Sequence, residues 1–310
     1  MSSSVVQTIS SGEVAKKSKS NSLWSDSVKR LKKNKASMVS AYFIIFVCFV
    51  ALFAKYLAPY SFETQDMSKI LMPPGPDNWL GTDSLGRDIF SRVIYGSRMS
   101  MAVGILTSVI SLIFGSIYGA VSGWFGGKVD SFLMRIVDIL YSIPTLVLMI
   151  LVKVVFDSVS LFDDPELKAL SSILLALSVV GWVTLARVVR GQVLQAKQNV
   201  YVEAAISMGA SSSWIIIKHI FPNILGPIIV LLTFQIPSNI LFESFLSFIG
   251  LGLQPPYSSL GVLANEGWRS LENYPHLIIS PSVVLFLIML AFNLFGDGLR
   301  DAFDPKLKGR

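Results

Sequence analysis

The chain has few of the residues from which most enzyme sites are built. Its 310 residues include one cysteine, Cys48, and two histidines, His219 and His276. A disulfide within the chain is therefore excluded, and a zinc site made of Cys and His lacks ligands. The motifs H-E-x-x-H, C-x-x-C and G-x-S-x-G do not occur. We therefore expect that this chain is not an enzyme and holds no metal.

A nucleotide-binding loop is also missing. The nearest approach to G-x-x-x-x-G-K-S/T is Gly-Gly-Lys at residues 126–128, and Val129 follows where Ser or Thr is required. If ATP drives this protein, another chain must bind the ATP and its Mg²⁺. We therefore expect no cofactor in this chain.

Charge is the third scarcity. Charged residues make up 15% of the chain, where a soluble protein has about a quarter. Apolar residues make up 52%, and the mean hydropathy is +0.61. A helix needs about 20 apolar residues to cross the ~30 Å core of a bilayer. The sequence therefore predicts an all-α membrane protein with six transmembrane helices, at residues 38–58, 99–123, 136–156, 171–189, 224–250 and 277–295.

The distribution of Lys and Arg predicts the orientation of these spans. Much of the formal net charge of +6 lies in the first 37 residues, which suits a cytoplasmic, lipid-facing tail better than a nucleic-acid site. Alternation of the spans then makes the acidic loop 157–170 external and the basic loop 190–223 cytoplasmic. Both chain ends are predicted to be cytoplasmic, and residues 1–22 are predicted to be disordered.

The fifth expected span combines polar side chains with two prolines. Gln235, Asn239 and Glu243 lie along it, and Pro227 and Pro237 bend or interrupt the helix. Because polar groups in lipid must face protein or water, we expect this span to line a translocation pathway. Plain hydrogen bonding between helices is the alternative.

Two shorter patterns predict contacts made by the other spans. Arg135 and Asp138 are three residues apart and can form an ion pair on one face of the third span, and Asp138 is a further candidate for the pathway. Gly115, Gly119 and Gly123 form a close-packing face on the second span, either within this chain or against a second subunit.

The connector at residues 59–98 is expected to be external. Asp83 or Ser84 can cap a short helix that lies along the membrane surface. The cluster of Asp83, Arg87 and Asp88 suggests metal binding at first sight. The favoured interpretation is a solvated helix start with an ion pair between Asp83 and Arg87 at i,i+4.

The most informative segment is YVEAAISMGASSSWIIIKHIFP, at residues 201–222 between two long apolar runs. Gly209 permits a sharp backbone reversal, and Pro222 is expected to close the second half. The pattern predicts two short helices joined at a glycine elbow, which sit on the membrane surface and offer a projection to a partner. An ordinary amphipathic connector is the alternative. The segment resembles the EAA loop in the membrane subunits of ATP-binding cassette importers.

Three further motifs are similar to the C-type permeases of dipeptide, oligopeptide and nickel importers. They are LGTDSLGRDIFSRVIYGSRMS at 80–100, SFIGLGLQPP at 247–256 and NLFGDGLRDAFDP at 293–305. The resemblance covers roughly residues 25–308. It implies the type I importer permease fold and the bacterial cytoplasmic membrane. The chain would then comprise a basic cytoplasmic tail (1–37), a first span with an external connector (38–98), a core permease domain with five spans (99–298) and a cytoplasmic tail (299–310).

The resemblance also implies partners and residue roles. The partners are a second permease in a heterodimer, two cytoplasmic ATPases that bind ATP and Mg²⁺, an external substrate-binding protein and membrane lipid. In the loop, Glu203 would bond to ATPase backbone or basic groups, Ala204 and Ala205 would allow close approach, and Gly209 would set the elbow, with Pro222 at the end.

Two other classes of function stay open at this point. A secondary transporter driven by an ion gradient would need paired inverted repeats, and no clear repeat is evident. A non-transporting membrane scaffold or sensor would need no polar cavity. For an importer, the solute is a di- or oligopeptide, or a related small solute such as nickel. The sequence of this chain leaves that choice open, because the external binding protein commonly sets it.

Overall fold

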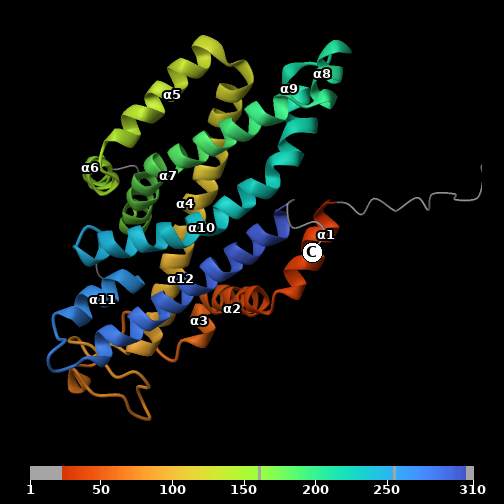
Figure 1. Cartoon of the computed structure of the whole chain (residues 1–310). Helices are drawn as coiled ribbons and strands as arrows, with labels where there is room; N and C mark the ends of the chain where they lie inside the picture. The colour runs from red at the N-terminus through yellow and green to blue at the C-terminus, as the bar shows by residue number, and fades with distance from the viewer. Residues whose placement is uncertain (1–22, 160–161, 254–255, 305–310) are drawn as a thin grey trace, which may run out of the picture.

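The computed structural model describes residues 23–159, 162–253 and 256–304, and this part of the chain is almost entirely helical (Figure 1). The all-α fold class is therefore confirmed. The helices are α1 (Leu23–Lys33), α2 (Lys35–Leu52), α3 (Ala54–Leu57), η1 (Met67–Lys69), α4 (Ile89–Phe125), α5 (Gly127–Ser142), α6 (Thr145–Ser158), α7 (Pro165–Lys197), α8 (Val200–Ser207), α9 (Ser212–Ile215), η2 (Ile216–Ile220), α10 (Phe221–Phe248), α11 (Leu260–Trp268) and α12 (His276–Phe303).

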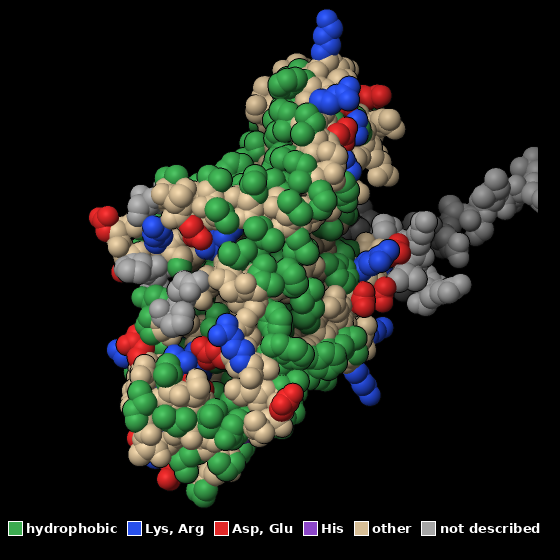
Figure 2. All heavy atoms as spheres, turned by 90° about the vertical axis from the view of Figure 1, so that its left-hand side faces the viewer, with side chains coloured by type: hydrophobic (Ala, Val, Ile, Leu, Met, Phe, Trp, Pro, Cys, Tyr) green, Lys and Arg blue, Asp and Glu red, His purple; other side chains and the backbone are tan. Residues whose placement is uncertain are grey.

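Five of the six expected spans are continuous helices within the described residues. α2, α4, α7 and α12 are long and apolar enough to cross a membrane, and so is the run Ser212–Phe248 that ends in α10. Figure 2 shows a broad band of apolar side chains along the centre of one face, with Lys, Arg, Asp and Glu toward its margins. Such a band suits contact with lipid.

The third expected span is bent. α5 and α6 meet at 95° on either side of Ile143 and Pro144. Proline has no N–H to donate, and its ring disfavours a helical conformation of the preceding residue. Ile143 accordingly has extended backbone angles, with φ −85° and ψ 133°. The third expected span, at residues 136–156, is therefore a broken span and not one continuous helix.

The short helix expected on the membrane surface is the first part of α4. Asp88 caps this helix, because its carboxylate accepts a hydrogen bond from the backbone N–H of Ser91 at 2.7 Å. From there 37 residues run without a break, a length of about 55 Å that exceeds the bilayer core. Neither of the two expected caps holds this position, and the boundary expected at residue 98 falls inside α4.

The glycine face of α4 packs within this chain. A Cβ added at Gly115, Gly119 or Gly123 would lie 2.8, 2.4 or 2.8 Å from atoms of α7. These glycines therefore let α4 and α7 approach closely, and the two helices cross at the centre of the molecule (Figure 1). The alternative, in which this face meets a second subunit, was wrong because α7 already occupies it.

α11 is a short helix wedged among α4, α10 and α12. A Cβ at Gly261 would lie 2.4 Å from the carbonyl oxygen of Ser244 in α10, and one at Gly267 would lie 2.5 Å from the backbone nitrogen of Ile278 in α12. Backbone therefore meets backbone on two sides of α11. It lies at the same end of the molecule as the 59–88 connector (Figure 1).

The segment expected as a plain N-terminal tail is helical from Leu23. α1 packs against the end of α12, where Arg30 Nη1 donates a hydrogen bond to the carbonyl oxygen of Asp304 at 3.3 Å. Ser37 Oγ, early in α2, donates to the carbonyl oxygen of Leu294 at 3.2 Å. α12 continues past the boundary expected at residue 298. Residues 1–22, which we predict to be disordered, lie outside the described residues.

Candidate functional site

The loop between α7 and α10 forms a projection that we call the knob (residues 200–220). Its helices α8 and α9 meet at Gly209, whose φ of +79° lies in the left-handed region. Nothing lies within 4 Å of a Cβ built at Gly209, so backbone conformation rather than crowding requires the glycine. The expected pair of short helices with a glycine elbow is confirmed, and the pair stands at one end of the molecule (Figure 1).

Pro222 does not close the second half of the knob. It is the second residue of α10, and the helical backbone that precedes it does not end there. A single π turn, Ile216–Ile220, precedes α10, and helical structure continues from Ser212 to Phe248. The expected role of Pro222 as a terminator was wrong.

The knob has a buried inner side and an apolar outer side. Val202, Ala205 and Ile215 are at most 2% exposed and pack against the ends of α7 and α10. Met208 at the elbow is 81% exposed. The other large apolar side chains exposed on the knob are Val200, Tyr201, Ile206, Trp214 and Ile217.

The motif residues of the knob divide between these two sides. Glu203 and Ala204 are exposed, and the Glu203 carboxylate has no hydrogen bond or ion pair with the described residues. Ala205 is buried and packs against the bundle, so it anchors the knob. Glu203 and Ala204 therefore lie, with Met208 and the other exposed apolar side chains, on the side of the knob that a second protein can reach.

A cavity of about 320 Å³ opens where the bend between α5 and α6 faces α7 and α10. Gln235 and Asn239, two of the expected pathway residues, line it together with Tyr141, Thr145 and Ser238. Asn239 Nδ2 donates to Ser108 Oγ at 2.9 Å, and Gln235 Nε2 donates to the carbonyl oxygen of Gly181 at 3.0 Å. No charged side chain is among the residues lining this cavity.

Asp138, the other residue expected in the pathway with Gln235, Asn239 and Glu243, does not line this cavity and does not pair with Arg135. Its carboxylate accepts a hydrogen bond from Arg187 Nη2 of α7 at 2.6 Å, and the Arg187 guanidinium lies 4.2 Å from the centre of the Tyr141 ring. The expected ion pair within one helix was wrong because α7 brings a better-placed cation against α5. The pair joins the two helices at an exposed position.

Glu243 lies in a sealed serine cluster instead of the cavity. It is 0% exposed, and its carboxylate accepts hydrogen bonds from Ser100 Oγ of α4 and Ser247 Oγ of α10, each at 2.8 Å. Ser100 Oγ also accepts from the backbone N–H of Leu260 at 3.2 Å, at the start of α11. Glu243 therefore fastens α11 to α4 and α10, which is a positioning role.

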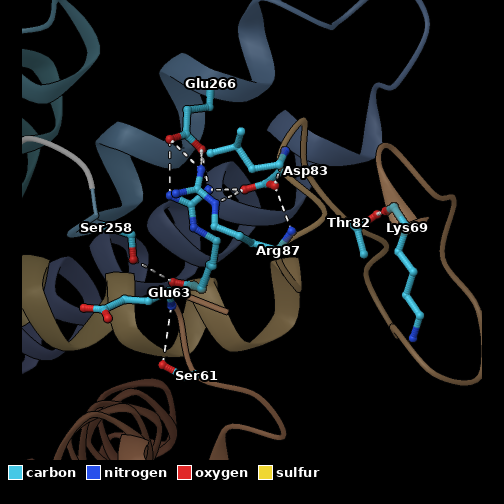
Figure 3. A network of polar contacts seen from close by, with 10 residues as sticks. Ser61, Glu63, Lys69, Thr82, Asp83, Arg87, Ser258 and Glu266 are labelled. Atoms are coloured by element: carbon cyan, nitrogen blue, oxygen red, sulfur yellow. Dashed lines mark hydrogen bonds and ion pairs between the residues drawn. The ribbon is translucent and has the colours of Figure 1, made fainter. Parts of the chain in front are cut away.

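A second buried polar cluster holds the other end of α11 (Figure 3). Asp83 Oδ2 accepts hydrogen bonds from Arg87 Nε and Arg92 Nη1, both at 2.6 Å, and both arginines also pair with Glu266 of α11. The side chains of Asp83, Arg87 and Arg92 are at most 4% exposed. The expected Asp83–Arg87 pair is confirmed, but its solvated setting was wrong because α11 covers it.

The cluster of Asp83, Arg87, Arg92 and Glu266 does not have the composition of a metal site. Two guanidinium groups stand where a cation would have to bind, and no group of three or more His, Cys, Asp or Glu among the described residues could hold a metal ion. The sequence analysis missed Arg92 and Glu266. Glu266 is 174 residues from Arg92, so no local spacing could have linked them.

Comparison with known families identifies the class of protein. Residues 111–309 match the family described as binding-protein-dependent transport system inner membrane component. Residues 22–74 match the N-terminal TM domain of oligopeptide transport permease C. The two matches together include the knob, the cavity and α1.

Curated relatives extend over nearly the whole chain. The oligopeptide transport system permease protein OppC of Bacillus subtilis is 41% identical over 94% of this chain and 92% of the relative. The dipeptide transport system permease protein DppC of the same organism is 43% identical over 91% and 86%. The glutathione transport system permease protein GsiD of Escherichia coli is 37% identical over 92% and 91%.

The fold also has a counterpart among solved structures. An inward-facing MetNI methionine ABC transporter superposes with a TM-score of 0.55, at 17% identity, over 68% of this chain and 96% of that one. At this identity the likeness concerns the fold alone. The family matches and the curated relatives decide against the gradient-driven carrier and the scaffold: the chain belongs to the binding-protein-dependent transport inner membrane components and is a transmembrane permease subunit of an ATP-binding cassette importer.

Proposed function

We propose that this chain forms one wall of an importer that moves di- and oligopeptides across the bacterial cytoplasmic membrane. The observation that carries the proposal is the two-sided knob, whose inner side is fixed in the bundle while its outer side stays free. The names of the relatives supply the substrate class, since they transport oligopeptides, dipeptides and glutathione. A related small solute such as nickel is the alternative cargo.

The knob is the contact with a cytoplasmic ATPase. Met208 would enter an apolar groove of the ATPase, because an exposed large side chain at the tip is the group that a partner can desolvate. Glu203 would pair with ATPase backbone N–H or basic groups, and Ala204 leaves room for close approach. Ala205 and Gly209 keep the knob in shape. ATP and Mg²⁺ belong to the ATPases and not to this chain.

The cavity beside the bend is this chain's part of the pathway. Gln235 and Asn239 present carboxamides, which can donate and accept hydrogen bonds with peptide groups. Because the lining is uncharged, it does not bind a peptide through the charges of the peptide's side chains. It therefore suits the passage of peptides of many sequences, and the selection of the peptide is made by another subunit. Asp138, paired with Arg187, would act at the edge of this pathway, whereas Glu243 would hold its wall in position.

The assembly we propose contains a second, paralogous permease, two ATPases and an external substrate-binding protein. A cavity formed by this chain alone needs an opposite wall for a peptide-sized path. Because the glycine face of α4 is occupied by α7, the second permease would face the cavity, where Ser238 and Leu241 of α10 are exposed. Both chain ends would lie in the cytoplasm, as the Lys and Arg distribution predicts.

Two experiments test this proposal. The full set of subunits is co-expressed with an affinity tag on this chain, and the ATPases should co-purify with it in the absence of substrate. Single cysteines at Asp163 and Ser207, in a Cys48→Ser background, are then labelled in intact cells with a membrane-impermeant maleimide. Labelling at position 163 only is expected. Labelling at position 207 only, or failure of the ATPases to co-purify, would overturn the orientation or the assembly respectively.

A further inference from the structure

The outer side of α1 carries a stripe of lysines that no protein group neutralises. Lys29, Lys32 and Lys33 are exposed, and Lys35 is exposed at the first residue of α2. At 100° per residue the three lysines of α1 share one face of the helix. None of the four has an ion-pair partner among residues 23–159, 162–253 and 256–304. Four unpaired positive charges therefore stand within seven residues.

The opposite side of α1 is committed to the protein. Ser27 is 7% exposed, Leu31 is partly buried, and Arg30 caps the end of α12 through the carbonyl oxygen of Asp304. Ser27 and Leu31 lie opposite the lysine stripe, and Arg30 lies at its side. α1 is therefore held with its lysines outward, so their position is set by the fold and is not that of a free tail.

The lysine stripe is continuous with the lipid-facing side of α2. Val39, Tyr42, Phe46 and Phe49 follow Lys35 at helical spacing and are 68, 65, 59 and 52% exposed. From Lys35 to Phe53 the helix rises about 27 Å, close to the thickness of the bilayer core. When this apolar face lies in lipid, Lys35 and the end of α1 lie at the level of the headgroups.

We propose that Lys29, Lys32, Lys33 and Lys35 form a binding surface for the headgroups of anionic phospholipids. The surface fastens α1 to the membrane while Arg30 and Ser37 fasten the same segment to α12. Each lysine near an anionic surface strengthens binding by about fivefold. The proposal rests on the proposed function in one respect, which is the membrane leaflet whose lipids are bound. The binding of headgroups itself requires neither transport nor a given orientation.

The carboxylates of the neighbourhood do not cancel this surface. Asp297 and Asp301 are exposed on the last turns of α12, but neither pairs with a lysine of α1. Asp26 lies in the first turn of α1, where a carboxylate favours the helix N-terminus. Asp26 also precedes Lys29 by three residues and so shares its face, and four lysines with one aspartate leave a net charge of +3 toward the headgroups. This charge attracts phosphatidylglycerol more than the zwitterionic phosphatidylcholine.

The test is lipid retention by the purified full-length chain. The protein is incubated in detergent micelles with phosphatidylglycerol and phosphatidylcholine of identical acyl chains, and bound lipids are counted by native mass spectrometry. The wild type should retain phosphatidylglycerol preferentially, with a preference that falls as salt rises. The variant Lys29→Gln/Lys32→Gln/Lys33→Gln/Lys35→Gln should lose at least about tenfold of that preference.

A matched variant with the same loss of charge separates this surface from net charge. Lys55→Gln/Lys128→Gln/Lys218→Gln/Arg269→Gln removes four exposed cations from other parts of the chain and should keep the wild-type preference. Circular dichroism confirms that both variants are folded. Unchanged preference in the α1 variant, or an equal loss in the matched variant, would overturn the proposal. Peptide uptake is not measured, so a failure here is distinct from a failure of the importer assignment.

Discussion

Arg92 Nη1 lies 2.6 Å from Asp83 Oδ2 of the connector, and the two side chains are only 1% and 4% exposed. Arg92 is the fourth residue of α4. Glu266 of α11 completes the contact from the far end of the chain. The connector and the start of α4, which adjoin in sequence, thus meet the distant α11 at one buried cluster of charges. With the serine cluster at Glu243, this arrangement holds α11 at both of its ends.

Removal of Arg92 should destabilise the protein strongly. Arg92→Met leaves the Asp83 and Glu266 carboxylates short of a cation, and breaking a buried ion pair costs about 3–5 kcal/mol. The expected result is a clear fall in the melting temperature of the detergent-solubilised chain. Arg98→Met is the control, because Arg98 is exposed on the same helix. Equal melting temperatures for both variants would show that the cluster contributes little.

Replacement of Gly209 should uncouple transport while the protein stays folded. Proline fixes φ near −65°, which is incompatible with the +79° of the elbow. For Gly209→Pro we expect normal membrane insertion but loss of substrate-stimulated ATPase activity in the assembled complex. Gly209→Ala should reduce the substrate-stimulated ATPase activity less, since the left-handed backbone conformation costs an alanine about 1 kcal/mol.

Gly191→Ala is the matched control for the elbow. A Cβ at Gly191 also meets nothing within 4 Å, but the residue lies in α7 without a positive φ. It should therefore retain full ATPase coupling. Wild-type coupling in Gly209→Pro would mean that the knob is an ordinary connector.

Changes on the outer side of the knob should weaken ATPase docking. Met208→Glu puts a charge on the side chain expected to be desolvated, and Glu203→Lys reverses the charge of the free carboxylate. Either change should lower the amount of co-purified ATPase by about tenfold, which corresponds to 1.4 kcal/mol. Met67→Glu, at an exposed position of the connector, should change nothing. Unaltered co-purification in both knob variants would place the ATPase contact elsewhere.

Accessibility to water should separate the cavity from the serine cluster. In a Cys48→Ser background, a cysteine replacing Ser238 lines the cavity, whereas one replacing Ser247 lies beside the buried Glu243. Thiols react as thiolates, which form in water and not in a sealed apolar site. We expect Ser238→Cys to react with a polar methanethiosulfonate reagent and Ser247→Cys to resist it. The reverse order of reactivity would remove the cavity from the pathway.

Local patterns predicted much of the fold and of the knob. Runs of apolar residues located five continuous spans, and Gly209 between two short segments predicted the elbow, because both depend on neighbours in sequence. The bend at Pro144 was not predictable in the same way. Pro227 and Pro237 lie inside α10 without breaking it, so the presence of proline does not tell a bent span from a straight one.

The partners of charged residues could not be predicted, because they come from distant segments. Asp138 pairs with Arg187 of α7 instead of the nearby Arg135, and Glu266 reaches back to Arg92. Glu243 and Asn239 lie one helical turn apart on the fifth expected span. Both were predicted to line the pathway, because polar groups in lipid must face protein or water. The packing of α11 and α4 encloses Glu243 completely, whereas Asn239, although only 3% exposed, borders the cavity.

Uptake of a labelled peptide into proteoliposomes tests the importer assignment most directly. The vesicles hold either this chain alone or this chain with a paralogous permease, two ATPases and the external binding protein. We predict uptake only by the complete set, only with hydrolysable ATP, and not when this chain carries Gly209→Pro. ATP-independent uptake by the lone chain would contradict the account and indicate a gradient-driven carrier.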